Sequence, residues 1–475
     1  MPTLTAAPAT AILTPADPRW DDARQAWNLA VDQRPAAIAV PRSADDAAAA
    51  VSFARRRGLR VAAQGTGHGA APLGSLDGTV LSKTHAMRRV SVHPAARTAR
   101  AEAGALWGNV VEAAARHGLA ALAGSSPDVG VVGYTLGGGM GWLGRAYGLS
   151  ANNVEAIELV TADGRFVRAD ACSEPDLFWA LRGGGGSFGV VTAIELRLFP
   201  IREVYGGLLW WTIDAGESVL RAWRELTQSG LPDEFTTSFR FMRFPRLPDI
   251  PEPVRGRWLA VVDVVHLGTP AEANRLLAPL RALGPVTDTV QTVPVRALSR
   301  LHMEPEHPVP TVSDGLMLAS LPPEAVTEIV RVAGGGTASL MTAVELRHVG
   351  GEMRRVRPGN GALAAVHADY ALFAVGMAPT PDAAHAVARG VAAVRSAVTP
   401  WAASQMHLNL AGTSRDPRSF WSGPAYDRLR RIKAAVDPGD MIRSNHPIPP
   451  FPATGAGGQP RDLARVLATS DSYSG

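Results

Sequence analysis

The chain has 475 residues, of which 46% are hydrophobic and 19% are charged, and it contains 48 glycines and 37 prolines. This composition indicates a globular protein with many loops, large enough for about two or three domains, and excludes a disordered or fibrous chain. The formal net charge is only +4 and no stretch concentrates basic residues, so we do not expect nucleic acid as a partner.

The single cysteine, Cys172, excludes a disulfide within the chain and any Cys-rich zinc or iron–sulfur site. The N-terminal segment has no basic region ahead of its short apolar run, and prolines interrupt that run, so a secretory signal is not predicted. No run of about 18 uncharged apolar residues occurs, so no membrane span is predicted either. We therefore expect a soluble, cytoplasmic protein, and the sequence leaves its oligomeric state open.

The first part of the chain predicts mixed α and β structure. A strand at 36–40 is followed by a helix that begins after Ser43, which resembles a capping box with Asp46, and ends at Gly58. Another strand follows directly after that glycine. The expected elements from there on are strands at 59–63 and near 79–82, 88–93 and 98–102, and a helix from about Ala105 to His117.

Residues 154–169 predict a β-hairpin, because a turn at 162–165 separates two apolar segments. Ser173 is expected to cap a short helix at 176–182, and an apolar strand follows at 190–199.

The composition changes after Pro200. Alternating, Trp-rich segments between 203 and 300 predict a sheet that covers another part of the molecule, so we place a domain boundary near Pro200. Toward the C-terminus an amphipathic helix is expected around 425–436, and residues 453–475 are expected to form a weakly ordered tail.

Three glycine clusters stand out, at 64–69, 137–141 and 183–189. The third contains the patterns of a dinucleotide-binding loop, G-x-G-x-x-G, and of a nucleophile elbow around Ser187, G-x-S-x-G. Both require a strand before the loop and a helix after it, whereas here a helix comes first, so neither is predicted. A Walker A loop is excluded because neither lysine follows a glycine. The glycines then indicate either bare main chain around a large ligand with phosphates or tight turns between strands.

Four segments, taken together and in order, resemble the flavin-linked oxidases of the vanillyl-alcohol oxidase and p-cresol methylhydroxylase superfamily. They are QGTGHGA at 64–70, the glycine-rich segment 124–153, PDLFWALRGGGGSFGVVT at 175–192, and the segment 407–448. Within that superfamily they look most like the berberine-bridge-enzyme-like branch, of the 6-hydroxynicotine-oxidase type. Each segment alone is weak, but their joint order is specific.

The resemblance implies an α+β protein with the two-domain PCMH-type FAD-binding fold. Residues 1–202 would form the FAD-binding domain, with its core at about 35–202. Residues 203–415 would form the substrate-binding domain, an antiparallel sheet backed by helices that lies over the isoalloxazine ring. Residues 416–475 would return to the FAD domain and end in the tail.

The resemblance also implies FAD as cofactor, attached covalently through His68. Many relatives carry a second link from a cysteine in a G-x-C-P-x-V-G loop, but here Ser126 occupies that position, so we predict a single attachment and a bystander role for Cys172. The other residues to which the resemblance gives contacts with the cofactor are Gln64, Gly65, Thr66, Gly67, Gly69, Gly124, Ser125, Ser126, Val129, Gly130, Gly133, Tyr134, Gly139, Gly141, Val191, Asn409 and Asn445.

Three residues are candidates for catalysis. Val129 occupies the position that is taken to control access of dioxygen to the flavin, and valine there is typical of oxidases. Relatives commonly carry Tyr-x-Asn near the C-terminus, with the tyrosinate as base, whereas this chain has His407-Leu408-Asn409. His407 is a possible replacement base, because histidine titrates near neutrality. Alternatively, the substrate, such as an amine, needs no strong base.

The resemblance predicts an FAD-dependent oxidase that takes hydride from a C–H bond next to oxygen or nitrogen of a small molecule and is reoxidised by O2 to give H2O2. The alternatives are oxidative tailoring of a secondary metabolite, including ring formation or dehydrogenation, a carbohydrate oxidase, and a flavin-binding protein without turnover. The segment 302–307 contains two histidines and two glutamates, but Pro305 and Pro308 break any helix that would align them. We predict a loop at the mouth of the substrate site there, and no metal.

Overall fold

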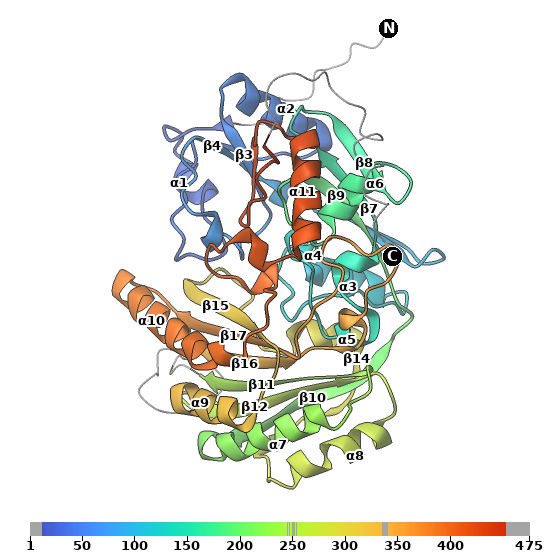
Figure 1. The fold of residues 1–475 in the computed structure, drawn as a ribbon, viewed down its shortest axis with the longest axis vertical. Helices are drawn as coiled ribbons and strands as arrows, with labels where there is room; N and C mark the ends of the chain where they lie inside the picture. Colours follow the sequence, from blue (N-terminus) through green and yellow to red (C-terminus); the bar gives the residue numbers. More distant parts are fainter. Residues whose placement is uncertain are drawn as a thin grey trace.

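The computed structural model describes residues 12–244, 246, 248, 252, 254–334 and 341–452, and the structural statements below concern these residues. The tail expected at 453–475 lies outside them, as does the start of the N-terminal segment. Figure 1 shows two parts along the long axis of the molecule: one contains the small β-sheets and α11, and the other contains a broad sheet with helices beneath it.

A small sheet carries both the beginning and the end of the described chain. Its strands, in spatial order, are β1 (Ile12–Leu13), β2 (Ala37–Ala39), β4 (Thr79–Lys83), β3 (Arg60–Gln64) and β18 (Ile442–Arg443). All neighbours are parallel except β1 and β2. Because β18 pairs with β3, the C-terminal segment returns to the first part of the chain.

Two helices of this part, α2 (Ala44–Arg56) and α3 (Trp107–Ala115), begin and end close to the predicted positions. The short helix α1 (Trp20–Ala23) was not predicted. Ser43 Oγ accepts a hydrogen bond from Asp46 N–H at 3.2 Å, as expected for the cap of α2, and Gly58 follows the helix with φ +63°.

A second sheet contains the predicted hairpin. Its strands, in spatial order, are β5 (Val90–His93), β6 (Thr98–Glu102), β9 (Val190–Arg197), β7 (Val154–Val160) and β8 (Phe166–Asp170), all antiparallel. The helix α6 (Pro175–Leu181) precedes the glycines that lead into β9. The order helix, glycine loop, strand is therefore confirmed.

The predicted cap of α6 is wrong. The residue before the helix is Glu174, with φ +50° and no side-chain cap, whereas Ser173 gives its backbone N–H to Asp170 Oδ1 at 2.8 Å. An Asx-type turn at the end of β8 uses Ser173, so the helix begins at Pro175, which needs no N–H partner.

Three further helices position the glycine loops. They are α4 (Val131–Leu136), α5 (Gly144–Tyr147) and α11 (Gly423–Val436). Lys433 of α11 is fully buried, and its ammonium donates to Ser187 O at 2.8 Å, to Ile442 O at 2.9 Å and to the Asp437 carboxylate at 2.5 Å. These contacts fix the returning C-terminal segment against the loop 183–189.

The broad sheet is antiparallel and is built entirely from residues 203–377. Its order is β13 (Thr287–Asp288), β10 (Glu203–Thr212), β12 (Trp258–His266), β11 (Phe235–Arg243), β16 (Ala343–His348), β17 (Tyr370–Met377) and β15 (Thr311–Leu318), and β14 (Gln291–Pro294) also pairs with β10. The helices packed on it are α7 (Gly216–Gln228), α8 (Pro270–Arg281), α9 (Pro323–Ala333) and α10 (Pro381–Val398).

The two faces of this sheet differ in polarity because side chains alternate along each strand. On β11, Phe239 and Phe241 pack in the apolar core that the helices cover, whereas Ser238 and Arg240 point to the opposite face. The helices α7, α8 and α9 lie on the side of the sheet that is remote from the small sheets (Figure 1). The polar face is thus turned toward the part of the molecule that carries the glycine loops.

No helix in the described part of the chain combines the length and apolar character that a bilayer crossing requires.

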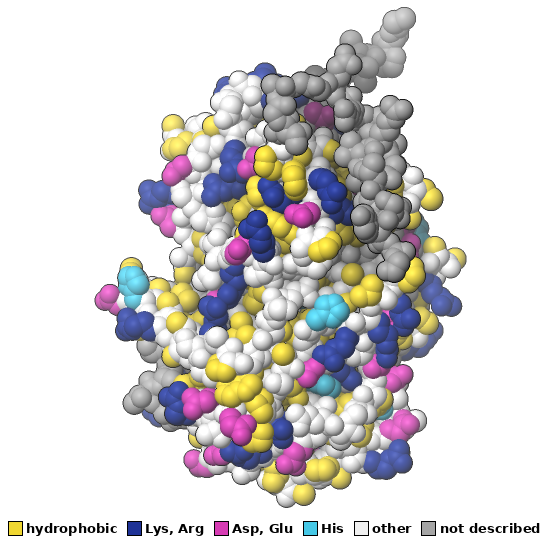
Figure 2. All heavy atoms as spheres, in the orientation of Figure 1, with side chains coloured by type: hydrophobic (Ala, Val, Ile, Leu, Met, Phe, Trp, Pro, Cys, Tyr) yellow, Lys and Arg dark blue, Asp and Glu magenta, His cyan; other side chains and the backbone are white. Residues whose placement is uncertain are grey.

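On the face drawn in Figure 2, basic and acidic side chains lie intermingled. The described residues also form exposed ion pairs, such as Arg331–Glu328 and Arg221–Glu217.

Candidate active site

The glycine loop 64–69 leaves β3 and packs closely on the segment before β2. Gly67 has φ +92°, and a Cβ at this position would lie 2.8 Å from the Cβ of Ala26, so only glycine fits. Trp27 N–H donates to Thr66 O at 2.9 Å. Main chain therefore fixes the loop on one side and leaves His68 partly accessible, with 23% of its side chain exposed.

Three neighbours surround the ring of His68. The Trp27 ring stacks on it with centroids 3.9 Å apart and planes 20° apart. Nδ1 lies 2.8 Å from Thr66 Oγ1, and Nε2 lies 3.5 Å from Asp128 Oδ1. Nε2 is buried and has no hydrogen-bond partner among the described residues. The ring is thus clamped in one orientation.

Asp128 connects this loop with the loop 124–130. Its carboxylate accepts hydrogen bonds from Ser126 Oγ at 2.8 Å and from Trp27 Nε1 at 2.5 Å. Burial raises the pKa of this carboxyl, but His68, Ser126 and Trp27 together lower it below its ordinary value. The hydroxyl of Ser126, at the position where relatives carry cysteine, is therefore a donor to Asp128. Sequence reasoning missed Asp128 and Trp27 as site residues.

The loop 137–141 packs against the segment that contains Asn409. Gly139 N–H donates to Asn409 Oδ1 at 3.0 Å, and a Cβ on Gly137 would lie 2.3 Å from Asn409 Nδ2. A Cβ on Gly141 would lie 2.0 Å from Ala123 O. Asn409 is exposed in spite of these contacts, so its amide is accessible to a ligand beside the loop.

His407 lies behind this loop. It is 1% exposed, its Nδ1 accepts from Asn409 N–H at 3.3 Å, and a Cβ on Gly138 would lie 2.8 Å from its Nε2. Burial and the charge of Arg347 lower the pKa of His407 to about 4. The imidazole is neutral at pH 7 but has no open side on which a substrate can approach. The role of His407 as base therefore stays a prediction, and the burial of its ring gives that prediction no support.

The C-terminal segment reaches the first glycine loop. Asn445 Nδ2 donates to Gly69 O at 3.4 Å, and the hydroxyls of Ser444 and Ser187 are 2.8 Å apart. Residues from three distant parts of the chain therefore meet at this point.

The other predicted cofactor contacts fall into two groups. Gly69 and Gly133 are exposed. A Cβ on Gly130 would lie 3.6 Å from the Thr66 side chain, so the loops 64–69 and 124–130 are in contact. Val191 differs, because its side chain is buried in the core and lines no open surface. The remaining predicted cofactor contacts lie in or against the loops 64–69, 124–130 and 137–141. They are Gln64, Gly65, Thr66, Gly67, Gly124, Ser125, Ser126, Val129, Tyr134, Gly139 and Gly141.

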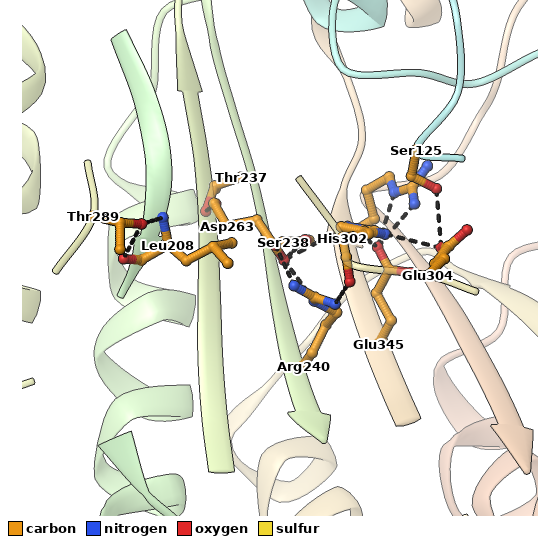
Figure 3. A network of polar contacts seen from close by, with 11 residues as sticks. Ser125, Leu208, Thr237, Ser238, Arg240, Asp263, Thr289, His302, Glu304 and Glu345 are labelled. Carbon is orange, nitrogen blue, oxygen red and sulfur yellow. Dashed lines mark hydrogen bonds and ion pairs between the residues drawn. The ribbon is translucent and has the colours of Figure 1, made fainter. Parts of the chain in front are cut away.

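Buried charges cover the polar face of the broad sheet (Figure 3). Arg240 and Asp263 are 4% and 0% exposed and form a bidentate pair with distances of 2.8 and 2.5 Å. On β16, Arg347 donates to Glu345 at 2.9 Å and also to Met140 O at 3.0 Å, directly before Gly141. A charged side chain of the sheet therefore donates a hydrogen bond to the main chain of the glycine loop.

The loop after Leu301 joins the same network. The His302 ring is buried, with Nδ1 3.2 Å from Glu304 Oε1, and Ser125 Oγ donates to Glu304 at 3.1 Å. Partial burial raises the pKa of Glu304, but His302, Arg347 and Ser125 together lower it to about 2. The Glu304 side chain is 42% exposed and is thus a fixed negative charge beside the loop 124–130.

In the described ranges, no group of three or more His, Cys, Asp or Glu side chains could hold a metal ion. The segment 302–307 is a loop, and Cys172 is exposed in the turn between β8 and α6.

The described residues fit a large cofactor with phosphates and an aromatic ring system. Glycine loops present bare main chain, Tyr134 Oη and His68 Nε2 are buried without partners, and Asn409 is exposed beside the loop 137–141.

Comparisons with known proteins agree with this fit. A family model for an FAD binding domain matches residues 35–170. (R)-6-hydroxynicotine oxidase of Paenarthrobacter nicotinovorans is 29% identical over 464 residues, which cover 92% of this chain and 96% of that protein. The structure of 6-hydroxy-D-nicotine oxidase from Arthrobacter nicotinovorans is 26% identical, covers 93% of this chain and 98% of its own, and has a TM-score of 0.78.

The chain is thus similar to FAD-linked oxidoreductases: residues 35–170 match an FAD binding domain, and the similarity to a named oxidase of this kind extends over nearly the whole chain. A glucooligosaccharide oxidase of Sarocladium strictum is 36% identical to this oxidoreductase over 223 residues, 46% of this chain and 44% of that protein. A berberine-bridge-enzyme-like protein of Physcomitrella patens, 21% identical, shares the fold with a TM-score of 0.81 over 93% of this chain and 97% of its own.

Proposed function

We propose that this oxidoreductase is an oxidase that holds FAD covalently through His68, takes hydride from a C–H bond next to oxygen or nitrogen of a small organic substrate, and passes the electrons to dioxygen, which gives hydrogen peroxide. The observation that carries this proposal is the ring of His68, held in one orientation by Trp27 and by the loops 64–69 and 124–130 and still partly exposed. The relatives named as oxidases support it.

Each part of the site has a task in this proposal. The chemistry that FAD supplies when bound is the acceptance of two electrons as a hydride. His68 keeps the cofactor in place, Asn409 and Asn445 orient it by hydrogen bonds, and the glycine loops let main-chain N–H groups approach its phosphates. Val129, which is partly buried, is assigned the control of dioxygen access in this proposal.

The burial of His407 bears on the substrate. A buried, neutral imidazole without access cannot take a proton from an alcohol, so the proposal favours a substrate that needs no strong base. A neutral amine is of this kind, because its nitrogen lone pair stabilises the positive charge that remains when hydride leaves. A carbohydrate is the second candidate, favoured by the glucooligosaccharide oxidase relative.

Two measurements test the proposal. Wild-type protein precipitated with acid should keep its yellow colour in the pellet, whereas His68→Ala should bind FAD but release it to the supernatant. Oxygen uptake and peroxide release should then be measured with panels of cyclic amines, secondary alcohols and sugars. A colourless protein, or full release of the flavin by acid from the wild type, would contradict the covalent link, and absence of turnover with all panels would contradict the oxidase.

A further inference from the structure

The clamp around His68 accounts for both nitrogens of its ring. One nitrogen faces a carboxylate and the other faces a hydroxyl: Nε2 lies 3.5 Å from Asp128 Oδ1, and Nδ1 lies 2.8 Å from Thr66 Oγ1. A neutral imidazole carries its proton on one nitrogen and a lone pair on the other, and the partner of each nitrogen decides which is which. A carboxylate only accepts hydrogen bonds, so it favours the proton on Nε2. A hydroxyl can donate, so it tolerates the lone pair on Nδ1.

Asp128 is itself held in place for this task. Ser126 Oγ donates to Oδ1 at 2.8 Å and Trp27 Nε1 donates to Oδ2 at 2.5 Å, so both carboxylate oxygens are fixed. The same Trp27 ring stacks on His68 and sets the plane in which the imidazole edge meets the carboxylate. The net effect of these neighbours is to lower the pKa of Asp128, which keeps it ionised at neutral pH.

We propose that Asp128 is the positioning residue that prepares His68 for attachment to FAD, by keeping the ring proton on Nε2 and leaving the lone pair on Nδ1 as the nucleophile. This inference rests on the covalent link proposed above. In this proposal the Thr66 hydroxyl contacts the attacking nitrogen, Nδ1, before the reaction. The hydroxyl must rotate away so that Nδ1 can bond to carbon.

The attachment balances as an oxidation. The new bond joins Nδ1 to the 8α carbon of the flavin, one C–H bond of that methyl group and the N–H bond at Nε2 are lost, and two electrons with two protons reduce dioxygen to hydrogen peroxide. Bond formation at Nδ1 places positive charge on the imidazole. The Asp128 carboxylate stabilises that charge and takes the Nε2 proton, which passes on to solvent.

A merely structural role for Asp128 predicts something different. If the carboxylate served only to tie Trp27 and Ser126 together, its replacement would loosen the loops and weaken FAD binding as a whole. The positioning role predicts slow attachment of FAD that is nevertheless bound.

The test follows attachment in the full-length chain. Protein produced under riboflavin limitation is mixed with FAD, and covalent flavin is measured over time by intact mass after denaturation and by flavin in the acid pellet. Reversible binding of FAD is measured separately, in a His68→Ala background. Asp128→Asn should slow attachment at least tenfold and change reversible FAD binding less than twofold, and Asp128→Glu should restore part of the rate. Asp170→Asn, which alters a carboxylate that accepts hydrogen bonds in the turn after β8 and has no contact with His68 among those described, should behave as wild type.

Each outcome decides the question. Attachment by Asp128→Asn at the wild-type rate overturns the proposal, and so does a loss of reversible FAD binding that matches the loss of attachment. If Asp128→Asn does not fold, NMR of the flavin peptide from wild-type enzyme decides instead: a link at Nδ1 is expected, and a link at Nε2 overturns the proposal. Wild-type protein without covalent flavin would contradict the proposed function itself, which separates the two failures.

Discussion

The two sides of the candidate site are built in different ways. On one side, the loops 64–69 and 137–141 present main chain. At several of their glycines a Cβ would collide with neighbouring atoms. On the other side, the polar face of the broad sheet presents buried charged side chains, among them Arg240 and Asp263. The main-chain loops suit a cofactor with phosphates. The charged face of the sheet suits discrimination among substrates, because the replacement of one side chain there changes the site without moving the backbone.

This difference predicts that the sheet side is the more sensitive to loss of a single charged group. Arg240→Met leaves the Asp263 carboxylate buried with only Ser238 and the more distant His302 beside it, so the free energy of unfolding should fall by about 3–5 kcal/mol. Urea titration of the wild type and the variant measures this.

Two controls sharpen that result. Arg240→Met combined with Asp263→Leu removes both charges and should regain most of the lost stability. Arg331→Met breaks the exposed pair with Glu328 and should cost less than about 1 kcal/mol. A single variant at Arg240 as stable as the wild type would show that the pair is not desolvated.

The same difference explains what the sequence could and could not reveal. The glycine clusters could be recognised in the sequence because the residue type itself indicates bare main chain. The elements that flank them, α2, β3, α6 and β9, were predicted in the correct order. The Arg240–Asp263 pair was not found, because its members lie on different strands and only the register joins them, although Asp263 within the apolar run of β12 was a visible sign. The Trp27–Asp128 contact spans distant positions that no local pattern connects.

On the loop side, the expected sensitivity is to added volume. Gly141→Ala would bring a methyl group 2.0 Å from the carbonyl oxygen of Ala123, which is backbone and cannot swing away. The expected cost is about 1–3 kcal/mol, near the upper end, with loss of FAD binding because the loops 124–130 and 137–141 must separate. Thermal unfolding and flavin content measure both effects, and an unchanged flavin content would argue against close packing of these loops.

His407 lies where the two sides meet, and it predicts a pH dependence. Its pKa is about 4 in the folded protein against an ordinary 6.5, so the unfolded chain binds the proton first as pH falls. Stability is therefore complete above pH 6.5 and is lost progressively toward pH 4. Between pH 7 and about pH 4.5 this residue should account for about 2 kcal/mol.

The variant His407→Gln isolates that contribution from the other buried histidines. Its free energy of unfolding, measured by urea titration at several pH values, should fall less steeply below pH 6.5 than that of the wild type. Equal slopes would mean that His407 gains a proton in the folded protein. In that case its burial would no longer argue against a role as base.

The smallest effect is expected at Gly133, where the loop side is open. Gly133 lies within α4, and no described atom lies within 4 Å of a Cβ there. Gly133→Ala should therefore stabilise the flavin-free protein by about 0.5–1 kcal/mol, because alanine favours the helix. If FAD contacts this residue, as the sequence predicts, the same methyl group should weaken reversible FAD binding in a His68→Ala background. A more stable variant with unchanged FAD affinity would show that the cofactor does not contact Gly133. The main chain that contacts FAD would then be that of the other glycines.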